Sequence, residues 1–196
     1  MNVFRMRRLV PAGLCLMLAM PAVMSAQAAS ASESKTVAPA DSLNGLLSIT
    51  EHEVVGAADA MPADKYEFVP PATPGDFKGV RSFGSQVKHL AEANYEFFEG
   101  WNVPGAVDPK TIETLKTKDD IMKALRDSYT FAHAAIGSIT TGNAFDAMPG
   151  PPKGKATRVS LAAFCLAHSM DHYGQPVEYL RMNSIIPPAS RKPDSM

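Results

Sequence analysis

The sequence predicts an all-α fold, an up-down four-helix bundle with long loops. Apolar residues recur at spacings of three and four over four long segments, and capping residues, prolines or glycines bound each segment. No segment shows the alternation of apolar and polar residues, closed by hairpin turns, that is typical of β-strands. Four long amphipathic segments joined by loops are typical of a helical bundle.

The N-terminal residues 1–28 have the three-part pattern of a cleaved secretory signal peptide. Basic residues come first, an apolar run follows over residues 9–23, and small residues close the segment near Ala28. The apolar run is shorter than the roughly 20 residues that a membrane span requires. We therefore predict a secreted or periplasmic protein that is cleaved near Ala28 and has no stable membrane anchor after cleavage.

Composition and charge argue against a nucleic-acid partner and against a disulfide as a source of stability. The whole chain of 196 residues carries a formal charge of −1, and without the signal it is mildly acidic, so we expect no nucleic-acid partner. Of the two cysteines, Cys15 leaves with the signal. Cys165 then stands alone, and no intramolecular disulfide can form. Core packing, a metal or a partner chain must stabilise the domain.

The first predicted helix follows a flexible leader at residues 29–40 and opens a domain that spans residues 41–190. Asp41 or Ser42 caps this helix, and Met61-Pro62 ends it. Residues 62–81, rich in proline and glycine, form a long irregular connection. A polar tail at residues 191–196 ends the chain.

Three further helices complete the predicted bundle. Ser82 caps the second, which runs to Gly100 or just beyond. Thr117 starts the third, because acidic residues follow it in the first turn, and the segment continues to Gly142. The fourth helix begins near Thr157 and ends at about Met182, before a pair of prolines.

The fourth predicted helix carries the motif Cys165-x-x-His168-x-x-x-His172. Its four-residue spacing places the two imidazoles on one helix face, at a separation that a single metal ion can bridge. The helix is apolar over most of its circumference, and the two histidines are expected to point into this apolar part rather than toward water. Two alternatives are open: the pair binds a metal, or both histidines are buried in the core and form hydrogen bonds there.

A third metal ligand would have to come from another helix. His89 lies between Val87 and Leu90, on the buried side of the second predicted helix. His133 neighbours the solvent-facing side of its helix, and His52 lies in a charged segment. We therefore predict His89 as the third ligand.

An ordered set of short motifs resembles the DinB-like family over roughly residues 42–190. Those motifs are Met61-Pro62-x-x-Lys65-Tyr66-x-Phe68-x-Pro70, Arg81-Ser82-Phe83 with His89 and Asn94, His168-x-x-Asp171-His172-Tyr173-Gly174-Gln175, and Tyr179-Leu180-Arg181. The resemblance implies a four-helix bundle with a divalent metal site formed by His89, His168 and His172. It also implies a homodimer, since members of the family are often dimeric.

The resemblance leaves the reaction open. Several relatives are metal-dependent thiol transferases, so one hypothesis is a transferase or hydrolase in which the metal, which we expect to be zinc, nickel, manganese or iron, activates a thiol or water of a small-molecule substrate. The alternative is a non-catalytic, metal-stabilised binding or structural module. No general base or other catalytic residue is identified.

Three neighbours of the histidine pair have open roles. Cys165 is a fourth ligand, a redox-sensitive group or, as most buried lone cysteines are, a small apolar side chain. Asp171 either orients an imidazole or belongs to the polar face of the helix. For Gln175, the sequence favours packing over a hydrogen bond to a ligand.

Overall fold

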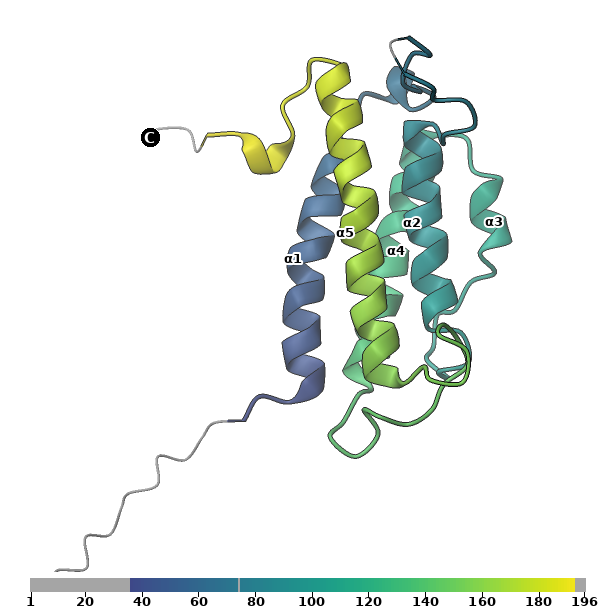
Figure 1. Ribbon diagram of the computed structural model, residues 1–196, viewed down its shortest axis with the longest axis vertical. Helices are drawn as coiled ribbons and strands as arrows, with labels where there is room; N and C mark the ends of the chain where they lie inside the picture. The colour runs from purple at the N-terminus through teal and green to yellow at the C-terminus, as the bar shows by residue number, and fades with distance from the viewer. Residues whose placement is uncertain (1–35, 74, 193–196) are drawn as a thin grey trace, which may run out of the picture. The chain divides into compact units, whose positions relative to one another are not determined.

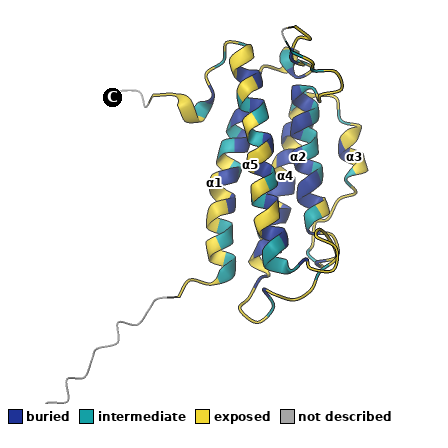
Figure 2. Ribbon diagram, in the orientation of Figure 1, coloured by how far each residue is buried: buried dark blue, intermediate teal, exposed yellow. Residues whose placement is uncertain are grey.

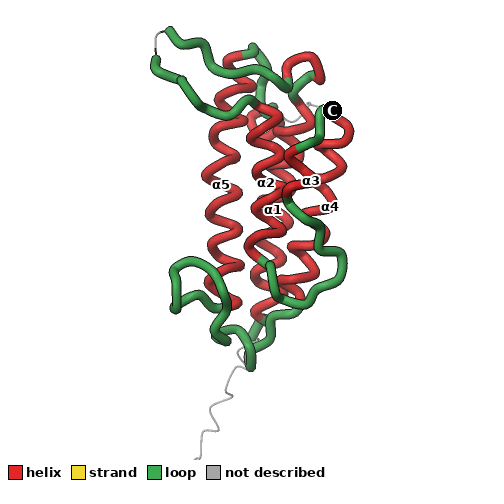
Figure 3. Tube along the Cα trace, turned by 90° about the vertical axis from the view of Figure 1, so that its right-hand side faces the viewer, coloured by secondary structure: helices red, strands yellow, loops and turns green. Residues whose placement is uncertain are grey.

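The computed structural model describes residues 36–73 and 75–192, so the predicted signal peptide lies outside the described residues. Four long helices dominate this part of the chain, which contains no β-strand (Figures 1 and 3). The all-α bundle that the sequence predicts is confirmed. The long helices are α1 (Pro39–Ala60), α2 (Phe83–Phe97), α4 (Lys118–Gly137) and α5 (Arg158–Met182), and the short ones are η1 (Ala63–Lys65), α3 (Lys110–Glu113) and η2 (Pro188–Ser190).

The sequence predicts an up-down bundle, but the consecutive long helices α2 and α4 are parallel rather than antiparallel. Asn94 and Tyr95, near the C-terminal end of α2, contact Ser128 and Phe131 in the C-terminal half of α4, so these two helices run in the same direction (Figure 1). The connection between them, which includes α3, returns along the bundle. The two helices can be parallel because residues 98–117 are long enough to cross back along the bundle, whereas a short turn would have forced an antiparallel pair.

The predicted helix starts are confirmed at three of the four long helices. Ser82, Thr117 and Thr157 each accept a hydrogen bond from the backbone N–H three residues later. In α5, the hydroxyl oxygen of Ser160 accepts a hydrogen bond from the N–H of Thr157, which completes a capping box. These caps stabilise the starts of α2 and α5, the helices that carry the three histidines of interest.

Helix α1 begins earlier than predicted, at Pro39 rather than after Asp41 or Ser42. Proline suits the first helical position, because its φ is already helical and the missing N–H has no partner there in any case. The helix therefore includes the last two residues assigned to the leader.

Two helix ends also precede their predicted positions. Helix α2 ends at Phe97 rather than at Gly100, which has a φ of 76°. Helix α4 ends at Gly137 rather than near Gly142, because Asn143 folds the following residues into a turn by accepting a hydrogen bond from the N–H of Thr140. No helix in the described ranges is long and apolar enough to cross a membrane.

The core lies between the four long helices, whose facing sides are buried while their outer sides are exposed (Figure 2). The irregular connection after α1 is packed against the end of this core. Tyr66 donates a hydrogen bond from its hydroxyl to the carbonyl of Ala58, and its own carbonyl accepts from the N–H of Gly84. A Cβ on Gly84 would lie 3.1 Å from that carbonyl oxygen, so glycine permits the close approach that brings in the start of α2.

Candidate metal centre

Three histidines from two helices meet on the side of the bundle where α2 and α5 pack. His89 comes from α2, and His168 and His172 come from successive turns of α5. One ring nitrogen from each lies within 4.8 Å of one from each of the others. The ring centroids are 4.5 Å apart for His168 and His172, and 5.2 and 4.7 Å from His89 to these two rings. The structure thus brings together the three residues that the sequence selects.

The neutral form of all three imidazoles is favoured. Burial lowers the pKa of His89 from 6.5 to about 4, and the positive charge of Arg81 acts in the same direction. Burial also lowers the pKa of His168 and of His172, and Asp171 only partly opposes this effect. A neutral imidazole has a free lone pair, so the three rings are prepared to bind a cation near neutral pH without first releasing protons.

Gln86 fixes the orientation of His172. Its side-chain oxygen lies 3.0 Å from Nδ1 of His172, and its side-chain nitrogen donates to the oxygen of Gln175 over 2.6 Å. The side-chain nitrogen of Gln175 is farther from the same Nδ1, at 3.5 Å. Because the nearer group, the oxygen of Gln86, can only accept, the contacts favour a proton on Nδ1 and a lone pair on Nε2. Gln86 is 2% exposed, so this contact is shielded from water.

The structure gives Gln86 and Gln175 roles that the sequence did not predict. The sequence favours packing for Gln175, whereas its side chain forms the hydrogen bond with Gln86. Sequence reasoning missed Gln86 altogether. Its signal was a polar residue one turn before His89, on the face of the helix that also carries apolar core residues.

His168 provides the observation that tests whether this group suits a metal. Its Nε2 is buried and has no hydrogen-bond partner among the described residues. Leaving a polar atom in this state costs roughly 1–3 kcal/mol. Three imidazole nitrogens are a common donor set for zinc and for other divalent transition metals, and binding one would satisfy this nitrogen. The residues present therefore fit such an ion.

Aromatic and acidic side chains surround the histidines. The ring of Phe97 packs edge-on against those of Phe164 and His168, at centroid distances of 5.1 and 5.3 Å. On another side, a carboxylate oxygen of Glu92 lies 3.9 Å from Nδ1 of His89. The centre thus has an apolar side, formed by Phe97 and Phe164, and a carboxylate beside one of its rings.

Cys165 does not join the three histidines. It is fully buried and donates its S–H to the side-chain oxygen of Asn94 over 3.4 Å. Burial raises the pKa of this thiol to about 12, and its sulfur is not among the donor atoms that lie within 4.8 Å of one another. Of the open roles, a small core side chain therefore agrees best with the structure. Asp171 is exposed and acts on the histidines by its charge.

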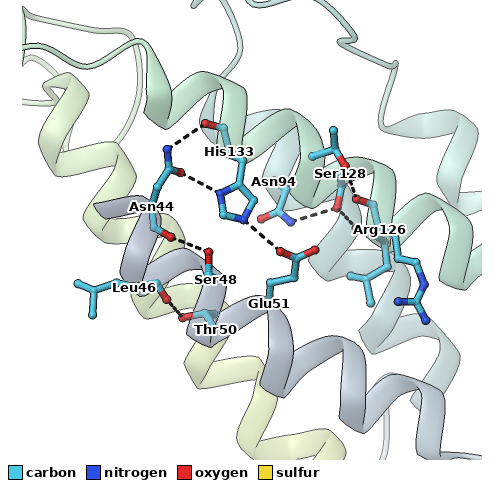
Figure 4. A network of polar contacts seen from close by, with 11 residues as sticks. Asn44, Leu46, Ser48, Thr50, Glu51, Asn94, Arg126, Ser128 and His133 are labelled. Atoms are coloured by element: carbon cyan, nitrogen blue, oxygen red, sulfur yellow. Dashed lines mark hydrogen bonds and ion pairs between the residues drawn. The ribbon is translucent and has the colours of Figure 1, made fainter. Parts of the chain in front are cut away.

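The remaining two histidines lie elsewhere. His133 on α4 bridges to α1, where its Nδ1 lies 2.9 Å from the side-chain oxygen of Asn44 and its Nε2 lies 3.1 Å from a carboxylate oxygen of Glu51 (Figure 4). His52 is exposed. Since both nitrogens of His133 are engaged, it is not available as a ligand, in agreement with the preference for His89.

Replacing His133 tests whether this bridge is only structural. We expect His133→Ala to lower the free energy of unfolding by about 1–2 kcal/mol, because two hydrogen bonds between α1 and α4 are lost. Urea denaturation measures this change. Metal content should not change, and a variant that loses metal together with stability would contradict the separation of the bridge from the centre.

Comparison with known proteins assigns the family. The model of the DinB superfamily matches residues 46–175, more than half of the chain. The chain belongs to the DinB superfamily. The matched range contains all three histidines of the centre and ends at Gln175. No curated protein matches this DinB superfamily member.

Proposed function

We propose that this protein binds one divalent metal ion through His89, His168 and His172. The observation that carries the proposal is that three imidazoles each place a ring nitrogen within 4.8 Å of the others. In addition, Nε2 of His168 is buried and has no hydrogen-bond partner among the described residues. Membership of a superfamily whose proteins bind metals supports it independently. Imidazole ligands suit zinc, nickel and iron, and manganese remains in the set to be tested.

The ligand set favours a catalytic site over a closed structural one. Structural zinc sites commonly have four protein ligands, whereas catalytic sites have three and keep one position for water or substrate. Among the described residues, the group has three members and includes no carboxylate or thiol. The side chain of His89 is 23% exposed, so solvent reaches the centre.

The proposed activity is metal-dependent transfer or hydrolysis on a small-molecule substrate. When bound, the metal ion lowers the pKa of a thiol or water that it ligates and so creates a nucleophile near neutral pH. The chain favours the neutral form of the three imidazoles by burying them in part. Phe97 and Phe164 provide a surface for an apolar part of the substrate. The alternative, a metal-stabilised module without turnover, predicts the same metal binding but no substrate-dependent change at the centre.

Metal content tests the proposed centre directly. Purified protein is loaded with zinc, nickel, manganese or iron in turn, desalted, and analysed by inductively coupled plasma mass spectrometry. We expect about one ion per chain for the best-fitting metal. His168→Ala and His172→Ala should lose most of it, while His52→Ala, which removes an exposed histidine, should not. Unchanged metal content in both of the first two variants would rule out the site.

We also propose that the protein is exported and that residues 1–28 are removed. The basic, apolar and small-residue pattern of this segment supports the proposal. Expression of the full chain in a bacterial host, followed by N-terminal sequencing, should give a mature chain that begins near residue 29 in the exported fraction. An intact N-terminus at Met1 in all fractions would be incompatible with this proposal.

Finally, we propose a homodimer, in line with the expectation from the family. The apolar side chains of Leu46 and Ile49 on α1 support it, because they are 53% and 63% exposed in the single chain. Light scattering coupled to size-exclusion chromatography measures the assembly.

A further inference from the structure

An accessible aromatic wall borders the metal centre. Phe164 lies on α5 one turn before His168 and is 44% exposed. Phe97, the last residue of α2, is half-buried. Because residues four apart share one face of a helix, Phe164 and His168 project to the same side of α5. The wall formed by Phe97 and Phe164 is therefore open to a ligand that reaches the centre from solvent.

The two phenyl rings form one surface with the imidazole of His168. The ring of Phe97 meets the rings of Phe164 and His168 edge-on, at centroid distances of 5.1 and 5.3 Å. The ring of Phe164 lies 6.3 Å from that of His168. Such separations are typical of interacting aromatic pairs. A group held beside His168 therefore has the wall as its immediate neighbour.

The exposure of Phe164 separates this wall from the core. Other aromatic residues at and after the end of α2 are at most 5% exposed, namely Tyr95, Phe98 and Trp101. One exposed phenylalanine would be ordinary for a protein surface. Phe164, however, is paired with a second phenylalanine whose ring packs on a candidate metal ligand. A ligand that covered Phe164 would remove apolar surface from water at the centre itself.

The opposite end of the centre is polar. Gln175 follows the histidine pair of α5 by about one turn, and its side-chain oxygen accepts a hydrogen bond from Gln86. Nearby charges have both signs: burial is the main cause of the low pKa of His168, Asp171 and Glu96 oppose it, and Arg81 adds to it. Because these charges partly cancel, contact with the wall is the stronger source of selectivity.

We propose that the ligand of the metal centre carries a flat aromatic group directly beside its donor atom, and that this group packs on Phe164 and Phe97. The inference rests on the proposed function, because it requires a bound metal with an open position. It narrows the substrate class from small molecules in general to aryl compounds.

Thiol binding to the cobalt-loaded protein tests the inference, since a thiolate on cobalt(II) gives a charge-transfer absorption band. Three thiols of similar acidity are titrated without oxygen: phenylmethanethiol, cyclohexylmethanethiol and 2-mercaptoethanol. We expect phenylmethanethiol to bind about tenfold more tightly than 2-mercaptoethanol, because only the former covers the wall. It should also bind more tightly than cyclohexylmethanethiol, which is apolar but not flat.

Ring variants locate the contact. Phe164→Ala should weaken phenylmethanethiol binding about tenfold and leave 2-mercaptoethanol binding and cobalt content unchanged. Phe164→Tyr keeps the ring and should bind all three thiols like the native protein. Phe145→Ala, which removes an 80% exposed phenyl ring from the loop between α4 and α5, serves as the control and should have no effect.

The outcomes separate this inference from the function on which it rests. Equal affinities for the three thiols in native protein that binds cobalt would overturn the inference and leave the metal centre intact. Bound cobalt that shows no charge-transfer band with any thiol would overturn the open coordination position and the inference together. If Phe164→Ala converts a dimer to a monomer without changing the thiol affinities, the wall is a contact between copies of the chain and the inference is wrong.

Discussion

Removing the metal with a chelator is expected to lower the melting temperature of the loaded protein by roughly 5–10 °C. A ligand that binds only the folded state stabilises it by about 2.7 kcal/mol when its free concentration is about 100 times its Kd. For a domain of this size, each kcal/mol corresponds to roughly 2–4 °C. Cys165 is a free buried thiol, so no disulfide within the described residues masks the effect.

The matched variants decide whether this shift comes from the three histidines. Thermal unfolding followed by circular dichroism, with and without chelator, should show the full shift in His52→Ala and little shift in His168→Ala. Readdition of the metal should restore the melting temperature of the native protein. A chelator shift of equal size in His168→Ala would show that the metal binds elsewhere.

Replacing Gln86 is expected to weaken metal binding by about 10–100-fold, although Gln86 is not a ligand. Gln86→Leu removes the acceptor for the Nδ1 proton of His172, so the ring can rotate and Nε2 is no longer presented in one direction. It also leaves the oxygen of Gln175 without its donor. A competition titration with a metal-binding dye measures the affinity.

A conservative variant separates positioning from simple packing. Gln86→Glu keeps an oxygen acceptor at the same place, so its affinity for the metal should stay within a few-fold of the native value. Both variants should unfold at similar temperatures in the metal-free state. If Gln86→Leu binds metal as tightly as the native protein, the contact with His172 has no part in metal binding.

Much of the fold follows from interactions between residues close together in the chain. The caps at Ser82, Thr117 and Thr157 depend on hydrogen bonds over three residues, and the helices depend on apolar spacing over one or two turns. The neighbourhood of His168 and His172 follows in the same way from a four-residue spacing on one helix. Such features are visible in the sequence.

Helix ends were less predictable because competing local contacts decide them. The end of α4 is set by the turn that Asn143 forms with Thr140, although apolar residues continue beyond it. Similarly, the parallel arrangement of α2 and α4 depends on how residues 98–117 cross over, and a loop of this length permits either direction. Neither outcome is encoded in helical periodicity.

The four helices, their caps and the paired histidines of α5 were thus accessible from local sequence patterns. The partnership of Gln86 with His172 was not, because it joins residues 86 positions apart through packing between two helices. His89 lies between these two cases. Its helix face was predictable, but its approach to His168 and His172 required α2 and α5 to be packed in register, which only the folded core imposes.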